Sequence, residues 1–156
     1  MPDRFQKPYL DSSVYIAAIR GEVAEPGKGN VSSQLLQLAE QGLFRVFAST
    51  FILAEVLRCK GCPPPLQPEE ERIIDSYLAK PFISWVEVDA LLARESRDLA
   101  RAHALKPVDA VHLASAIRLG ADQLLAWDGD FPVGQTVEGV LIERPHLTGW
   151  PAQLVV

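Results

Sequence analysis

Cysteine and histidine are scarce in this sequence of 156 residues, which holds two cysteines and three histidines. The cysteines, Cys59 and Cys62, form one Cys-x-x-Cys motif that is followed by three prolines. A structural zinc site needs a second such pair, or a Cys/His pair at a fixed spacing, and the sequence has neither. A thioredoxin-like redox motif opens a helix directly after a strand, whereas this motif closes a helical stretch. We therefore interpret it as a helix end that runs into a proline turn.

Long apolar runs are also absent. No stretch approaches the roughly 20 apolar residues of a membrane-spanning helix. Residues 1–8 lack the apolar core of a signal peptide. These two absences predict a cytoplasmic protein.

An excess of positive charge is missing as well, because 15 lysines and arginines face 20 acids and give a net charge of −5. This balance argues against a protein that binds nucleic acid by its overall electrostatics, since such domains are usually basic. It does not exclude a nuclease. Carboxylates of a metal site add negative charge that a bound cation neutralises, and local arginines and lysines can still form a groove.

The sequence does have the composition of a globular domain, with 48% hydrophobic and 22% charged residues. Its length suits one domain over residues 1–156, with a core at about 8–143 and a C-terminal tail at 144–156. We expect strands at 8–11, 44–49, 82–88, 123–127 and 140–143, and helices at 13–20, 31–41, 50–60, 68–79, 90–104 and 107–119. This alternation predicts an α/β fold, a three-layer α/β/α sandwich with a mostly parallel central sheet.

Asp11 stands at the end of the first predicted strand, before Ser12, Ser13 and an apolar helix. An Asp-Ser pair before a helix is an ordinary N-cap, and Asp11 taken alone favours that interpretation. Ligands of open α/β sheets bind at the carboxyl ends of the strands, however. The alternative is therefore a metal ligand, which other acids at the same edge would support.

Glu55 lies among apolar neighbours in the helix expected at 50–60. A buried carboxylate is costly unless it has a partner or a metal ion. Arg58, three residues later, offers an ordinary ion-pair partner. The local sequence does not choose between these two interpretations.

Three further acids stand at a helix start or after a strand. Asp109 falls in the first turn of the helix that begins at Pro107, where an acid also complements the helix dipole. Asp128 and Asp130 form an Asp-Gly-Asp sequence after a strand, which also suits a turn. His112, one turn after Asp109, either pairs with that acid or serves as a structural hydrogen-bonding residue.

These acids converge in the predicted fold. The first and fourth strands are expected to end side by side, which brings Asp11 to Asp128, and the helices that carry Asp109 and Glu55 reach the same edge. No lysine is expected near enough to neutralise Asp11, Asp109 or Asp128, and crowded carboxylates repel unless a cation is present. Oxygen ligands suit Mg²⁺ or Mn²⁺. Such ions activate water and hold a phosphodiester.

With these motifs the chain resembles the PIN-domain family, and specifically the VapC-like toxin ribonucleases of type II toxin–antitoxin systems. The resemblance runs from about Tyr9 to Glu143 and is fairly specific in the order and spacing of its four segments. These segments are Leu10-Asp11-Ser12-Ser13, Leu53-Ala54-Glu55-Val56, the stretch from Pro107 to Ala116, and Trp127-Asp128-Gly129-Asp130-Phe131.

The resemblance implies a Mg²⁺-dependent endoribonuclease that acts as the toxin of a toxin–antitoxin pair. It implies the catalytic residues Asp11, Glu55, Asp109 and Asp128, of which Asp11, Asp109 and Asp128 would bind the metal. Asp130 would be an auxiliary acid, and Ser13 would hold the site by hydrogen bonding. The resemblance also implies an RNA substrate, a cognate antitoxin protein and a homodimer.

One position departs from the family pattern. Many relatives carry Thr or Ser two residues before the aspartate that matches Asp128, and this chain has Ala126. The missing hydroxyl motivates a second hypothesis, a catalytically weak or inactive PIN-like binding module. A third, an aspartyl phosphoryl-transfer domain with Asp11 as nucleophile, is disfavoured because position 13 is serine and no lysine follows the fourth strand.

Overall fold

The computed structural model describes residues 7–56 and 67–147 of the chain. The Cys59/Cys62 motif and Arg58 lie outside the described residues. The strands are β1 (Pro8–Leu10), β2 (Val46–Ser49), β3 (Ile83–Val86), β4 (Gln123–Leu125), β5 (Thr136–Val137) and β6 (Val140–Glu143). The helices are α1 (Ser12–Ala24), α2 (Gly29–Glu40), α3 (Phe51–Glu55), α4 (Pro68–Leu78), α5 (Ala90–His103) and α6 (Pro107–Leu119).

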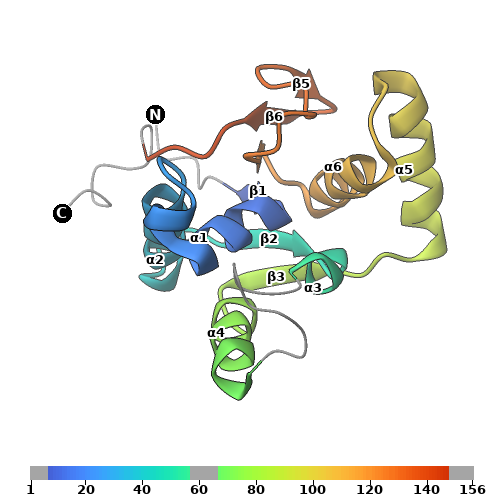
Figure 1. Ribbon diagram of the computed structural model, residues 1–156. Helices are drawn as coiled ribbons and strands as arrows, with labels where there is room; N and C mark the ends of the chain where they lie inside the picture. The colour runs from blue at the N-terminus through green and yellow to red at the C-terminus, as the bar shows by residue number, and fades with distance from the viewer. Residues whose placement is uncertain (1–6, 57–66, 148–156) are drawn as a thin grey trace.

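The strands form one sheet in the order β3-β2-β1-β4-β6-β5. All neighbouring pairs in the sheet are parallel except β5 and β6, which are antiparallel. Helices α1 and α2 lie on one side of the sheet, and α6 lies on the other with α5 packed on its outer side (Figure 1). This arrangement confirms the predicted three-layer α/β/α sandwich with a mostly parallel sheet.

The buried centre of the sheet explains how α6 is placed. All three residues of β1 are buried, as expected for a strand that is covered on both faces. Helix α6 presents the small buried residues Ala110, Ala114 and Ala116, which allow it to lie close to the sheet. Because α6 leads into β4 and runs back against it, the first turn of α6 lies at the carboxyl ends of the strands.

The connection between α1 and α2 is shorter than the expected loop at 21–30. Helix α1 continues past a kink at Gly21 (φ 81°, ψ 170°) to Ala24, and α2 already begins at Gly29. The carboxylate of Glu22 accepts hydrogen bonds from the backbone N–H groups of Gly27 (2.6 Å) and Asn30 (2.9 Å). A side chain of α1 thus supplies the acceptor that the first turn of α2 needs.

Two other elements differ from expectation. Helix α3 ends at Glu55, because the backbone of Val56 (φ −83°, ψ 87°) leaves the helical conformation. Strand β5 was not expected, because it has only two residues. It pairs with β6 through a tight turn in which Glu138 and Gly139 both have positive φ.

Gly29 offers a test of how closely α1 and α2 pack. A Cβ atom at this position would lie 2.4 Å from the backbone of Gly21 and Glu22, so Gly29→Ala must push the two helices apart. We expect it to lower the free energy of unfolding by about 1–3 kcal/mol, measured by urea denaturation. Gly129→Ala is the matched control, because a Cβ there meets no atom within 4 Å. Equal stability of the two variants would contradict this account of the contact.

Candidate metal centre

The neighbouring ends of β1 and β4 position the first acid. Leu10 pairs with Leu125 in parallel register, and the backbone N–H of Asp11 donates to the carbonyl of Leu125 at 3.2 Å. The segment after β4 then passes through Ala126 and Trp127 to Asp128. The structure therefore confirms that the first and fourth strands end side by side.

Asp11 is both a helix cap and a buried carboxylate. Its side chain accepts hydrogen bonds from the backbone N–H of Ser13 at 2.9 Å and from the Ser13 hydroxyl. Only 3% of the residue is exposed. Burial raises the pKa of Asp11 to about 6, against the opposing effects of His112 and of the Ser13 hydrogen bonds. The N-cap interpretation and the site interpretation thus describe the same side chain.

Ser13 joins the segments that follow β1 and β4. Its hydroxyl donates to Asp11 and accepts a hydrogen bond from the backbone N–H of Trp127 at 2.9 Å. The indole N–H of Trp127 donates in turn to the Ser32 hydroxyl at 2.9 Å. The Lys28 ammonium lies 5.9 Å from the centroid of the Trp127 ring. The residue before Asp128 is therefore fixed through both its backbone and its side chain.

Asp109, Asp128 and Asp130 form the closest group of acids. Each offers a carboxylate oxygen, and these oxygens all lie within 4.8 Å of one another. Asp109 is buried in the first turn of α6, and its Oδ2 atom has no hydrogen-bond partner among the described residues. Burial, followed by the charge of Asp128, raises the pKa of Asp109. A buried carboxylate oxygen without a donor beside two other carboxylates fits a cation, and an all-oxygen group suits Mg²⁺ or Mn²⁺.

Asp11 lies outside this three-acid group and is coupled to Glu55 and His112 instead. The charge of Glu55 raises the pKa of Asp11, whereas His112 lowers it. His112 also lowers the pKa of Asp109. The structure thus arranges the expected site residues in two subsets, Asp109 with Asp128 and Asp130, and Asp11 with Glu55, with His112 acting on both.

Glu55 pairs with His112. One carboxylate oxygen of Glu55, Oε1, lies 2.5 Å from His112 Nε2, and the other ring nitrogen, Nδ1, lies 2.7 Å from the Tyr9 hydroxyl. Of the two roles expected for His112, the structure shows the hydrogen-bonding one, and the partner is Glu55. The sequence did not reveal this pair, because 57 residues separate its members.

A lysine lies beside Asp130, an acid that the expectation about lysines near Asp11, Asp109 and Asp128 did not include. The ammonium of Lys106 pairs with Asp130 Oδ2. The pairing with Asp130 raises the pKa of Lys106, and the charges of Asp128 and Asp109 act in the same direction. Lys106 directly precedes the helix that carries Asp109, and this closeness in sequence was a signal that it lies near the acids.

Arg144 fixes the segment after β4 from a second side. Its Nη1 atom donates to the carbonyl of Ala126 at 2.9 Å and also to the carbonyl of Asp128. The sequence places Arg144 at the start of the expected C-terminal tail, for which no role is predicted. Together with Ser13, it holds the backbone around Ala126, where the expected hydroxyl is missing.

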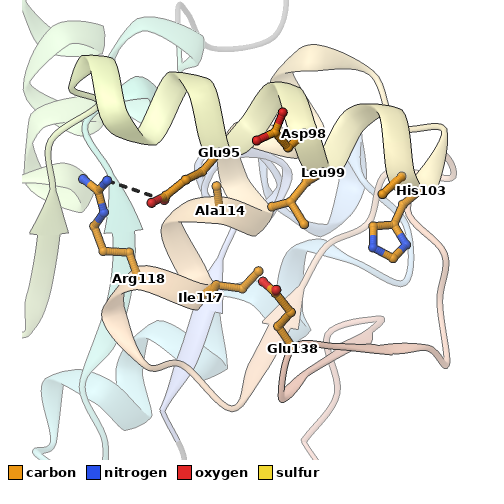
Figure 2. A pocket seen from close by; sticks show the side chains of 9 residues that line it. Glu95, Asp98, Leu99, His103, Ala114, Ile117, Arg118 and Glu138 are labelled. Atoms are coloured by element: carbon orange, nitrogen blue, oxygen red, sulfur yellow. Dashed lines mark ion pairs between the residues drawn. The ribbon is translucent and has the colours of Figure 1, made fainter.

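The acidic group opens to solvent, since Asp128 and Asp130 are both exposed. A separate hollow of about 550 Å³ lies between α5 and α6, over the apolar residues Leu99 and Ile117 (Figure 2). Its rim carries Glu138 and the pair formed by Glu95 and Arg118, with 3.5 Å between the two side chains. None of the expected catalytic acids lines this hollow. Because Asp128 and Asp130 are exposed, the acidic centre is a surface site, which suits a large substrate better than a small enclosed ligand.

Residues 9–133 match the family model of the PIN domain. The chain belongs to the PIN-domain family. Two curated relatives, ribonuclease VapC45 of Mycobacterium tuberculosis strain CDC 1551 / Oshkosh and ribonuclease VapC49 of strain H37Rv, are each 39% identical to it over 64 residues. The match covers 40% of this chain and 44% of each relative. The PIN-domain chain thus spans less than half the length of these two relatives.

Solved structures confirm the PIN fold. Mycobacterium tuberculosis VapC20, described as a sarcin–ricin loop cleaving toxin, superimposes with a TM-score of 0.59 at 20% identity over 84% of this chain and 97% of that one. A toxin–antitoxin complex from Klebsiella pneumoniae gives 0.58 at 18% identity, over 86% and 95% of the two chains. VapBC2 from Rickettsia felis, bound to a promoter DNA fragment, gives 0.59 at 16% identity, over 89% and 98%.

The buried carboxyl group of Asp11 makes stability depend on pH in the metal-free protein. Its pKa of about 6 in the folded state lies above the ordinary value of 3.8, so the folded state binds the proton more tightly than the unfolded chain does. Stability should therefore fall as pH rises from 4 to 7, by on the order of 2–3 kcal/mol. Asp11→Asn keeps an acceptor for Ser13 and removes this penalty.

We expect Asp11→Asn to raise the melting temperature at pH 7 in the presence of a chelator and to have little effect at pH 4. Thermal denaturation across this range checks the expectation. Asp98→Asn, at an exposed position of α5, is the control and should change the melting temperature at neither pH. A loss of stability at pH 7 in Asp11→Asn would show that burial of the charge is not the dominant effect.

Proposed function

We propose that this PIN-domain protein is a Mg²⁺-dependent endoribonuclease that acts as the toxin of a toxin–antitoxin pair. The observation that carries the proposal is the buried Oδ2 of Asp109, which has no hydrogen-bond partner in the described part of the chain, beside the exposed carboxylates of Asp128 and Asp130. The two curated relatives are named as ribonucleases, which supports hydrolysis of RNA phosphodiester bonds. The exposed position of the acids suits a polymer that lies across the surface.

In this proposal Asp11, Asp109 and Asp128 bind the metal ion, and Asp130 is an auxiliary acid whose oxygen already lies in the same group. Mg²⁺, or Mn²⁺ in its place, supplies charge neutralisation for the phosphate and activation of water when it is bound. Burial raises the pKa of Asp109, and the neighbouring charge of Asp128 adds to this effect; a divalent cation at this position would offset the repulsion between the two carboxylates.

The remaining chemistry belongs to side chains of the chain itself. Glu55 orients the attacking water and accepts its proton. Ser13 holds Asp11, and Arg144 holds the backbone on both sides of Trp127. Lys106, whose side chain is 70% exposed, places a positive charge at the rim, where it can meet an RNA phosphate.

The proposed partners are a cognate antitoxin protein and a second copy of the chain, in the cytoplasm. The fold is shared with proteins solved in a toxin–antitoxin complex and as VapBC2, which supports the antitoxin. The exposed carboxylates suit a basic side chain of such a partner. No helix in the described part of the chain is long and apolar enough to cross a membrane.

Ala126 favours a second candidate, a catalytically weak or inactive PIN-like binding module. The residue is buried, and its methyl group cannot replace the hydroxyl that many relatives carry there. A Mg²⁺ titration followed by thermal denaturation separates the two candidates. A working site is stabilised as the ion is added, whereas an inactive module shows no such rise.

The direct test is cleavage of a labelled single-stranded RNA by the full chain with Mg²⁺. We expect Asp11→Asn and Asp109→Asn each to reduce the cleavage rate by about 100-fold or more, because each removes a charged ligand. A chelator should stop the wild type, and Mg²⁺ should restore it. Asp98→Asn should cut at the wild-type rate. Full cleavage by Asp11→Asn would refute the assigned site.

A further inference from the structure

We propose that His112 is a positioning residue for Glu55, and that Tyr9 and Ser49 hold the imidazole ring in place. The inference rests on the proposed ribonuclease reaction, in which Glu55 handles the attacking water. It goes beyond that reaction because it assigns a role to three residues that contribute no acid to the site.

The contacts form a continuous chain of hydrogen bonds through the interior. The backbone N–H of Ser49, at the end of β2, donates to the Tyr9 hydroxyl at 3.1 Å. That hydroxyl lies 2.7 Å from His112 Nδ1, and His112 Nε2 lies 2.5 Å from Glu55 Oε1. Tyr9 is fully buried and His112 is 1% exposed, so water does not compete for the Tyr9 hydroxyl or the two ring nitrogens. The main chain of β2 is thereby connected to a site carboxylate on α3.

The direction of the hydrogen bond between His112 and Glu55 follows from which of the two groups can donate. When Glu55 is ionised its carboxylate can only accept, and the hydrogen between His112 and Glu55 then belongs to Nε2. The Tyr9 oxygen already accepts from Ser49, and its own hydroxyl either donates to Nδ1 or accepts from it. In both arrangements His112 presents an Nε2–H to Glu55.

Glu55 needs such a contact because its own helix gives it little support. Helix α3 has five residues and ends at Glu55, and the backbone turns away at Val56. A helix this short is marginal without outside contacts. His112 lies on the much longer, buried helix α6, one turn after Asp109. The contact therefore sets the position of Glu55 relative to a proposed metal ligand.

The ring of His112 is itself held on two sides. Its centroid lies 5.7 Å from that of Tyr9 and 6.2 Å from that of Phe51, both in tilted arrangements. Tilted ring pairs at these distances restrict rotation of the imidazole. The hydrogen bond to Glu55 therefore comes from a preorganised donor, as a precise catalytic geometry requires.

The experiment compares His112→Leu with His112→Gln in the full chain. Leucine fills the space but cannot donate, whereas glutamine places an amide N–H close to the position of Nε2. We expect His112→Leu to lower kcat for RNA cleavage by about 10–100-fold with little change in KM, as for loss of other supporting contacts in active sites. His112→Gln should recover a large part of this loss. Tyr9→Phe, which frees Nδ1, should have a smaller effect of the same kind.

Three measurements distinguish loss of the Glu55 contact from misfolding and from loss of metal binding. Thermal denaturation identifies variants that merely fail to fold, and Mn²⁺ affinity by calorimetry should stay within about threefold of the wild type because no ligand is removed. Imidazole ¹⁵N NMR should show hydrogen on His112 Nε2 in the wild type and a changed signal in Glu55→Gln. His103→Leu, at an exposed position of α5 away from the acidic centre, is the matched control for histidine removal and should keep the wild-type kcat.

Equal kcat in wild type and a folded His112→Leu would overturn the positioning role, and so would failure of His112→Gln to exceed His112→Leu. Absence of any cleavage by the wild type would instead overturn the proposed function, and the role of His112 with it. In that case the NMR signal of Nε2–H still reports the contact, so the two failures are not confused.

Discussion

The parallel pairing of β1 with β4 is the constraint on which the acidic centre depends. Parallel strands end at the same edge of a sheet, so the residues that follow them become neighbours although more than a hundred positions separate them in sequence. Ser13 fixes the two segments relative to each other, because its hydroxyl donates to Asp11 and accepts from the backbone N–H of Trp127. A shift in this pairing would break the hydrogen bonds of Asp11 with Leu125 and of Ser13 with Trp127.

The same convergence has an electrostatic cost that the fold itself does not fully offset. Burial raises the pKa of both Asp11 and Asp109. Lys106 pairs with Asp130, while Oδ2 of Asp109 has no hydrogen-bond partner in the described residues. The centre is thus more acidic than its own cations can balance. Such an imbalance is usual where function, and not stability, selects the residues.

Much of the fold and part of the site could be predicted from the sequence because their signals are local. The buried β1, the cap at Asp11 and the first-turn position of Asp109 each follow from a few adjacent residues. The contacts of Glu55 with His112 and of Arg144 with Ala126 could not be predicted, because they join segments that only the tertiary fold brings together. The early end of α3 had no local signal, since the apolar pattern continues past Glu55.

These tertiary contacts change how the substitution at Ala126 is understood. A hydroxyl there would add one hydrogen bond to the segment that carries Asp128. In this chain Arg144 instead donates to the carbonyls of Ala126 and Asp128, and Ser13 accepts from the N–H between them. The backbone of the segment is therefore held at three successive positions without the hydroxyl. The missing group would weaken the centre only if it acted on the metal ion or its water directly, and not through the position of Asp128.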